Sequence, residues 1–243
     1  MPHQNRVKVS VAMPAYNASR YIREIIQSVL AQDYDSFELL ICNDASKDNT
    51  LDIINEFRAH PKVRIFSNKT NLGPAATRNK LGRLAKGQYI TPCDADDLML
   101  AGNLRRLSRF LDTYPRIGVV YADVLILSVD MSDRLLEVPR IFGKDFRQVW
   151  DCEDNQINHP GSMVRRGLIL KVGGYDEMVY SVHDWSLWLK LAEITKFQYL
   201  EGEVYYVWRR NPKSISNLDK RHRRLNDIRK ITNEALQRRY GFR

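Results

Sequence analysis

Cysteine is scarce in this sequence of 243 residues. The three cysteines, Cys42, Cys93 and Cys152, are odd in number and lack paired metal-ligand spacing, which argues against a disulfide framework and a structural zinc site. Cys42 and Cys93 end apolar runs, so we expect small, buried hydrophobic side chains at both positions. This use of cysteine favours a reducing compartment.

Long apolar runs are also missing. No stretch approaches the ~18 apolar residues of a membrane span, and the best candidate, residues 117–127, is interrupted by Asp123. The first six residues lack the apolar core of a signal peptide. The hydrophobic content of 44% is ordinary for a globular protein. We therefore expect a cytoplasmic, globular chain.

Two nucleotide-binding motifs are absent after the first apolar run. No Gly-x-Gly-x-x-Gly follows it, which disfavours a dinucleotide-binding domain. Residues 14–17 read Pro-Ala-Tyr-Asn, where a sugar-phosphate nucleotidyltransferase needs a glycine-rich loop bearing arginine. The chain shows no internal repeat and no low-complexity linker before its tail, so one domain with a helical C-terminal extension is the simplest organisation.

Positive charge is concentrated at the end of the chain. The net charge is +9, and residues 219–243 carry nine Lys or Arg against three Asp or Glu, hence +6. Apolar residues in this tail fall near one helical face: Leu225, Ile228, Ile231, Ala235 and Leu236. Such a basic amphipathic helix could lie on an anionic membrane, on its own domain or on a partner. We favour peripheral contact with the inner face of an anionic membrane.

The first half of the chain alternates strand and helix patterns. We expect strands at residues 7–13, 37–42, 63–66 and 88–92, and helices at 20–31, around 51–57 and at 75–84. Asn17 and Ser19 are the candidate caps of the first helix. This alternation predicts an α/β fold, a mainly parallel sheet with helices on both faces.

The second half is less regular. We expect a helix at residues 103–113, a strand at 118–128, a loop-rich stretch at 129–154 and a short strand at 162–164. A further helix at 184–192 precedes two strands, at 197–200 and 204–208. We predict a catalytic domain over residues 1–217, divided into a nucleotide-binding half (about 7–100) and an acceptor half (about 101–217), with a basic helical tail over 218–243.

An acidic segment, Asp-Ala-Asp-Asp at residues 94–97, follows the fourth strand pattern. Two carboxylates spaced i and i+2 suit Mg²⁺ or Mn²⁺, which share oxygen ligands with substrate phosphates. Ligands of such sheets bind outside the carboxyl ends of the strands, where Asp44 and Asp94 both fall. The alternative is a solvated acidic turn.

Several pieces, taken together and in order, resemble the family 2 glycosyltransferases, which have the GT-A fold and transfer sugars from nucleotide-diphosphate donors. The match covers roughly residues 7–217. Its pieces are VSVAMPAYN at 9–17, SVLAQ at 28–32, NDASKDNT at 43–50, NLGPAATRN at 71–79, KGQYI at 86–90, DADD at 94–97, VGGYD at 172–176 and HDWSLW at 183–188.

The resemblance implies donor-binding roles for Pro14, Tyr16, Asp44, Arg78, Asp94 and Arg209. Tyr16 would stack on the base, and Asp44 would accept a hydrogen bond from an imide N–H such as that of uracil. Arg78 would lie near the base or diphosphate, and Arg209 could meet the diphosphate.

Asp94 and Asp96 would hold Mn²⁺ or Mg²⁺, with Asp94 also near the ribose, and Asp97 would cap the segment that follows. Asp184 would be the catalytic base of an inverting transfer, a help worth ~10²–10⁴-fold.

Structural alternatives stay open for each role. Tyr16 could be a core aromatic residue, Asp44 a turn or cap residue, and Arg78 a surface ion-pair partner. Asp184 could cap the helix that it begins, and Arg209 could be an ordinary surface arginine. On the acceptor side, the candidates are His183, Trp185 and His159; packing is the stronger expectation for Trp185, and a structural or substrate contact for the histidines.

Two positions depart from the common family pattern. Asn43 replaces a usual Asp, with little expected loss because Asp44 is the residue assigned to the base. His183 stands where a Glu often precedes the catalytic Asp, and a cationic His183 would lower the pKa of Asp184.

The resemblance thus implies an inverting, metal-dependent transfer of a sugar, with a UDP-sugar as the default donor, to a hydroxyl of a glycan or lipid-linked acceptor in polysaccharide or cell-envelope synthesis. The alternative is a non-catalytic glycosyltransferase-like binding domain; a nucleotidyltransferase is less favoured. No nucleic-acid partner is expected, because the ligand edge of the sheet is acidic.

Overall fold

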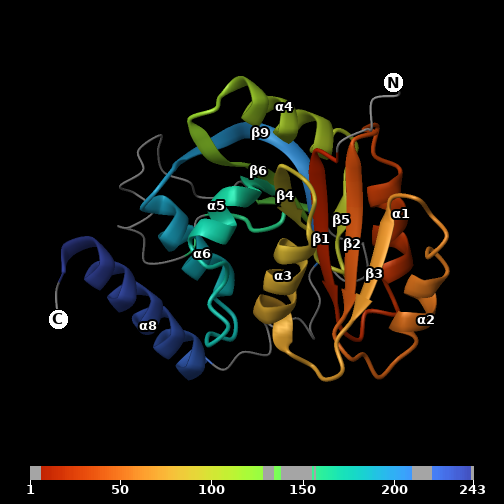
Figure 1. Ribbon diagram of the computed structural model, residues 1–243, viewed down its shortest axis with the longest axis horizontal. Coiled ribbons are helices and arrows are strands. Elements are labelled where there is room, and N and C mark those ends of the chain that lie inside the picture. Colours follow the sequence, from red (N-terminus) through yellow and green to blue (C-terminus); the bar gives the residue numbers. More distant parts are fainter. Residues whose placement is uncertain (1–6, 128–133, 138–154, 156, 210–220, 242–243) are drawn as a thin grey trace.

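A computed structural model describes residues 7–127, 134–137, 155, 157–209 and 221–241. Its strands form one sheet in the order β3-β2-β1-β4-β8-β6-β9-β5, with β7 paired to β6 (Figure 1). Helices cover both faces of this sheet, which confirms the predicted mixed α/β architecture.

The first half of the sheet is parallel throughout, since β1 pairs with β2 and β4, and β2 pairs with β3. Its strands are β1 (Val9–Ala15), β2 (Phe37–Asn43), β3 (Val63–Ser67) and β4 (Tyr89–Pro92). Its helices are α1 (Ile22–Leu30), α2 (Thr50–Asn55) and α3 (Gly73–Leu84). In Figure 1, α1 and α2 lie on one side of these strands and α3 on the other.

Alternation along β1 explains this layering. Val9, Val11 and Met13 are fully buried in the core that includes the apolar face of α1. Ala12 faces the opposite way, into the core that includes Ala75 and Leu81 of α3. Parallel strands covered on both faces are apolar throughout, and for this reason their sequence pattern was easy to read.

The second half mixes strand directions. Only β6 and β9 are parallel, whereas β4/β8, β6/β8, β6/β7 and β5/β9 are antiparallel. Its strands are β5 (Leu98–Met99), β6 (Ile117–Leu127), β7 (Arg134–Glu137), β8 (Ser162–Arg165) and β9 (Lys196–Arg209). Its helices are α4 (Asn103–Thr113), α5 (Arg166–Lys171), α6 (His183–Ala192) and α8 (Arg221–Tyr240).

Several local expectations were wrong. The two strands expected at residues 197–200 and 204–208 are one strand, β9, which pairs with β6 through register shifts. β5, β7 and α5 were not expected, because each is too short to show a period. Neither Asn17 nor Ser19 caps α1, whose N-cap is Tyr21. Cys42 and Cys93 are buried free thiols, as predicted, and Cys152 lies outside the described residues.

The C-terminal helix α8 packs on its own domain, beside α6 (Figure 1). Ile231 and Ala235 are buried against the outer face of α6, where Trp185 and Leu189 lie. Lys230 and Arg238 form ion pairs with Asp176 and Glu193 of the domain. The centre of the apolar stripe of the tail is thus covered by the domain, whereas Leu225 and Leu236 at its two ends stay exposed.

Candidate functional site

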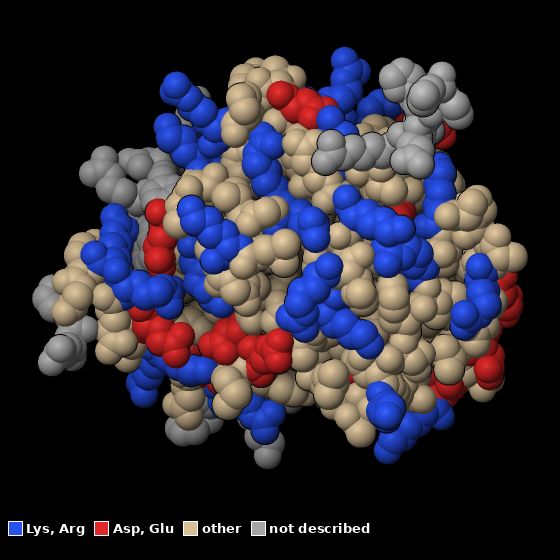
Figure 2. Space-filling model, in the orientation of Figure 1, with Lys and Arg blue, Asp and Glu red and all other residues tan. Residues whose placement is uncertain are grey.

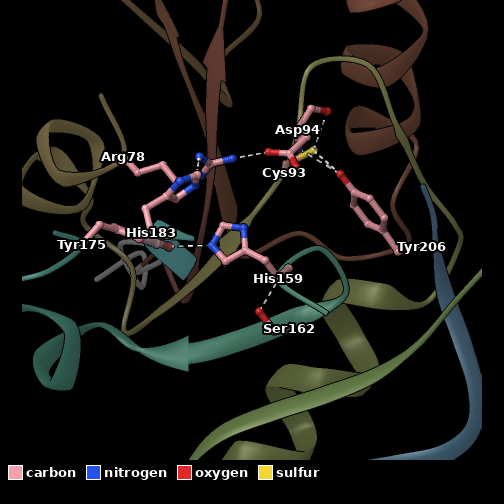
Figure 3. Close-up of polar contacts among 8 residues, drawn as sticks. All are labelled: Arg78, Cys93, Asp94, His159, Ser162, Tyr175, His183 and Tyr206. Atoms are coloured by element: carbon pink, nitrogen blue, oxygen red, sulfur yellow. Dashed lines mark hydrogen bonds and ion pairs between the residues drawn. The ribbon is translucent and has the colours of Figure 1, made fainter. Parts of the chain in front are cut away.

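The acidic segment lies in the turn between β4 and β5, at the carboxyl edge of the parallel strands. The backbone N–H of Asp94 donates to the hydroxyl of Tyr206 at 2.9 Å, and that hydroxyl also contacts Cys93 Sγ (Figure 3). Tyr206 is fully buried in β9. The long strand β9 therefore fixes the backbone of the acidic segment, while the side chain of Asp94 stays 33% exposed.

Asp97 has a different role from its neighbours. It is buried, and its Oδ1 accepts the backbone N–H of Arg209 at 2.9 Å, so it anchors the end of the distant strand β9 and not the segment that directly follows it, as had been expected. Burial raises the pKa of Asp97 well above its usual range, and the charges of Asp96 and Asp94 add to this effect. Asp96 and Asp94 are left as the partly exposed carboxylates.

Arg78 connects the acidic segment to α6. It is buried on α3, where one Nη ion-pairs with Oδ1 of Asp94 and the other contacts Nε2 of His183 at 3.0 Å (Figure 3). The surface ion pair that was the alternative for Arg78 is therefore wrong, because the guanidinium is buried and joins two distant segments. A buried, always charged guanidinium needs such partners to offset its lost hydration.

Asp184 stands in the first turn of α6, next to His183. Burial raises the pKa of Asp184 to about 6, against the opposing effects of backbone hydrogen bonds and the charge of Arg78. Its Oδ2 accepts a hydrogen bond from Nδ2 of Asn155 at 2.7 Å. A carboxylate with this pKa is ionised at neutral pH and basic enough to take a proton.

His183 does not act as the cation that was considered for this position. Burial and the charge of Arg78 lower the pKa of His183 to about 3, so its imidazole is neutral. The cation that acts on Asp184 is Arg78.

The base-side candidates lie at the ends of β1 and β2. Tyr16 directly follows β1 and is 45% exposed, so it is not a core residue, and Pro14 is partly exposed near the same end. The β1–α1 and β2–α2 loops are joined there, because Oδ1 of Asn17 accepts the backbone N–H of Lys47 at 2.8 Å. Asn17 and Ala45 both adopt positive φ, which fixes the shape of these loops.

Asp44 is buried and holds the start of α3. Its Oδ1 accepts from Asn68 and from the backbone N–H of Leu72, and its Oδ2 accepts from the backbone N–H of Gly73. This is the structural role that the sequence left open. A carboxylate has about four acceptor positions, so three are used here and one on Oδ2 is left for a ligand N–H.

The side chain of Arg209 points away from the acidic segment, although its backbone N–H binds Asp97. Its guanidinium ion-pairs with Glu24 at 2.9 Å and lies over the ring of Tyr21, 4.5 Å from the centroid. It is 2% exposed, so it is not an ordinary surface arginine. Contact with a diphosphate stays a prediction and would require the side chain to leave Glu24.

Two acceptor-side candidates prove to be packing residues. Trp185 is 2% exposed and lies in the cluster between α6 and α8. His159 is buried, with Nε2 2.8 Å from the hydroxyl of Tyr175, and burial, Arg78 and His183 lower its pKa (Figure 3). Neither side chain is accessible to an acceptor in this structure.

Sequence reasoning missed three contributors: Asn155, Tyr206 and Asn79. Asn79 binds the backbone of Tyr175 through both its Oδ1 and Nδ2, and so ties α3 to the segment before α6. Asn79 lies inside a recognised piece of sequence and Tyr206 inside a predicted strand, but neither had an assigned role. Asn155 lies next to the stretch without periodicity, where no sequence signal pointed to it.

A divalent cation is compatible with these residues. Arg78 occupies only Oδ1 of Asp94, and both Asp94 and Asp96 are partly exposed oxygen donors of the kind that Mg²⁺ and Mn²⁺ prefer. Within the described residues, no three His, Cys, Asp or Glu side chains form a complete metal cage. Two carboxylates fit a cation that takes its remaining ligands from a diphosphate and water.

Comparison with known sequences gives one family. The family model described as glycosyl transferase family 2 matches residues 10–173. The putative glycosyltransferase EpsE of Bacillus subtilis is 39% identical over 121 residues, covering 49% of this chain and 44% of EpsE. The chondroitin synthase of Pasteurella multocida is 33% identical over 221 residues, covering 89% of this chain and 22% of that protein. The chain thus spans less than half the length of these relatives.

Solved structures give the same fold. S. aureus TarS 1-349, in complex with UDP-GlcNAc, matches with a TM-score of 0.79 at 20% identity, over 95% of this chain and 66% of that chain. The mannosyltransferase PcManGT from Pyrobaculum calidifontis, in complex with GDP-Man and Mn²⁺, matches with a TM-score of 0.71 at 22% identity, over 96% and 65%. The predicted GT-A fold is confirmed.

Proposed function

Because this chain belongs to glycosyl transferase family 2, we propose that it transfers a sugar, with inversion, from a nucleotide-diphosphate sugar to a hydroxyl of a glycan or lipid-linked acceptor. One observation carries the proposal. The buried cation Arg78 pairs with the partly exposed carboxylate of Asp94 after β4 and contacts His183, which directly precedes Asp184, a carboxylate on α6 with a pKa of about 6.

The donor is held by the first half of the chain. Tyr16 stacks on the nucleotide base, and the remaining acceptor position of Asp44 receives the imide N–H of uracil, which favours a UDP-sugar. Asp94 and Asp96 would hold Mn²⁺ or Mg²⁺ together with the diphosphate, and the cation would supply Lewis-acid stabilisation of the leaving group. Support comes from the two solved relatives, whose complexes contain UDP-GlcNAc in one case and GDP-Man with Mn²⁺ in the other.

Asp184 acts as the base. The acceptor hydroxyl attacks the anomeric carbon from the face opposite the diphosphate, and its proton passes to a carboxylate oxygen of Asp184 as the new C–O bond forms. The bond between the anomeric carbon and the diphosphate oxygen breaks with its electron pair, so the configuration inverts in one step. Asn155 holds Oδ2 of Asp184 in place during this transfer.

A screen of nucleotide sugars tests the proposal. Wild-type protein is incubated with UDP- and GDP-sugars, with and without Mn²⁺, and the release of nucleoside diphosphate and the binding of each nucleotide are measured. Metal-dependent binding with turnover supports the transferase. Metal-dependent binding with no turnover, across donors and offered glycan acceptors, would favour the non-catalytic binding domain instead.

The organisation of the chain and its cellular place are part of the proposal. Residues 1–217 form the catalytic domain, and residues 218–243 form a helical extension that braces it. The part of the chain that the structure describes contains no helix long and apolar enough to span a membrane. We propose a cytoplasmic protein that meets an anionic membrane through exposed arginines of α8.

Figure 2 shows Lys and Arg spread over the visible face, with acidic side chains among them. Flotation with anionic vesicles, compared with neutral vesicles, tests the membrane contact. Equal flotation of the protein with anionic and with neutral vesicles would contradict the proposed membrane contact.

A further inference from the structure

Two buried histidines lie close to Arg78, and only one of them touches it. The rings of His159 and His183 are 6.2 Å apart between centroids (Figure 3). His183 contacts Arg78 at 3.0 Å through Nε2, whereas His159 contacts the hydroxyl of Tyr175 at 2.8 Å. The two histidines can therefore be compared directly, because both are buried but only His183 contacts Arg78.

The direction of the Arg78–His183 hydrogen bond is fixed by chemistry. A guanidinium only donates, so Nε2 of His183 must be unprotonated and accept. A protonated imidazole would place a second cation against Arg78, and burial already disfavours the charged form. The imidazole is therefore the neutral tautomer that carries its proton on Nδ1.

A neutral acceptor at this place has a particular effect on Arg78. The neutral imidazole accepts a hydrogen bond from one Nη of Arg78 and carries no negative charge that would attract the guanidinium away from Asp94. The other Nη therefore stays paired with the carboxylate of Asp94. A carboxylate at position 183 would form a second ion pair with Arg78 and draw the guanidinium toward α6. Since Asp184 follows directly on α6, such a group would also add a negative charge beside the base.

We propose that His183 is a positioning residue: as a neutral acceptor it aims Arg78 at Asp94 and so ties the start of α6, which carries Asp184, to the carboxylate on the donor side. The inference rests on the proposed function for its effect on donor binding. The bond itself is a property of the free protein. It adds a buried polar link between α3 and α6 to the apolar core that the two helices share.

The experiment has one part that needs no donor. Nitrogen-15 spectra of the imidazole in the full chain should show His183 as the neutral tautomer with Nδ1–H, in wild-type protein and not displaced toward the charged form down to pH 5. A cationic imidazole, or the tautomer with Nε2–H, would overturn the inference whatever the enzyme transfers.

The second part measures the binding of UDP and of GDP, each with Mn²⁺, by calorimetry. We expect His183→Leu to weaken binding about tenfold, the lower end of the effect of losing an outer partner of a metal ligand. His183→Gln keeps an acceptor and should restore binding to within about twofold of wild type, and His183→Glu should not restore it. The matched control is His159→Leu, which removes an equally buried histidine that does not contact Arg78.

The outcomes separate the two proposals. If His183→Leu and His159→Leu weaken binding alike, or if His183→Gln gives no rescue, His183 is merely a packing residue and the inference fails. If wild-type protein binds neither nucleotide, the proposed function fails, and the spectra alone decide the tautomer and thus the inference about the bond.

Discussion

The part of the chain proposed to bind the donor (residues 7–100, the donor half) and the part proposed to face the acceptor (residues 101–217, the acceptor half) position their proposed site residues by different means. In the donor half, Tyr16, Asp44 and Asp94 follow the ends of three parallel strands, so the register of these strands brings them to one edge. In the acceptor half, Asp184 stands on a helix whose place depends on packing against α8 and on contacts from Arg78 and Asn155. Substitutions in the donor half should therefore affect nucleotide binding alone, whereas substitutions that loosen the packing of the acceptor half should also lower kcat.

The sharpest test of this contrast is Asp184→Asn. The amide keeps the shape of the carboxyl group but cannot take a proton, so we expect kcat to fall by roughly 10²–10⁴-fold. Binding of the nucleotide diphosphate with Mn²⁺ should stay within about twofold of wild type, because the donor half is untouched. Turnover and calorimetry on the same preparation measure both, and full transfer by this variant would refute the assignment of the base.

Ile231→Ala tests whether packing reaches the chemistry. Ile231 is 2% exposed between α8 and α6, and truncation of a buried Ile costs about 2–5 kcal/mol of unfolding free energy. We expect a loss toward the lower end of that range and a reduced kcat, since α6 carries Asp184. The matched control is Ile54→Ala on α2, which should lose similar stability in urea titrations with no specific effect on kcat. If Ile231→Ala and Ile54→Ala lower kcat equally, packing in the acceptor half has no special influence on the chemistry.

Asp96→Ala should act on the donor half alone. Removing one of two carboxylate donors should weaken Mn²⁺-dependent binding of UDP by at least ~10–100-fold, the range seen when only an outer partner of a metal ligand is lost. Stability in the absence of metal should change little, because Asp96 is partly exposed. Metal-dependent binding at wild-type strength would show that the cation, if used, is held elsewhere.

The pH dependence of kcat gives the mildest test. Asp184 must be ionised to accept a proton, and its pKa is raised to about 6, so activity should be present above pH 6 and lost as the pH falls through it. We expect kcat to reach half its maximal value near pH 6 and to fall about tenfold for each pH unit below that. Nucleotide binding should not follow this titration. A flat profile between pH 5 and 7 would contradict the role of Asp184.

The sequence predicted the donor half well, for physical reasons. Buried parallel strands read as apolar runs, and helices between them show a clear period, so the strand ends and their polar residues could be located. Helix α4, the first helix of the acceptor half, was also predicted with its observed bounds, because its apolar residues follow a clear helical period. What sequence could not supply there was side-chain partnership, such as the three donors that Asp44 binds at the start of α3.

The acceptor half was harder because long-range contacts decide it. β9 was divided into two strands, since its register shifts against β6 interrupt the alternation of apolar residues. Nothing in the sequence around Trp185 indicated that the C-terminal helix α8 would cover this face of α6. The neutral state of His183 also depends on burial and on Arg78, which lies 105 positions away along the chain.

Burial of Asp184 has a consequence for engineering. A carboxyl group whose pKa is higher in the folded protein than its ordinary 3.8 weakens the fold as the pH rises from about 4 to about 6, and the whole penalty persists at neutral pH. Asp184→Asn removes that penalty, so thermal denaturation at pH 7 should show a more stable protein. Selection of variants by thermostability alone would then favour Asn at position 184. It would deliver well-behaved proteins that retain the nucleotide and no longer pass on the sugar.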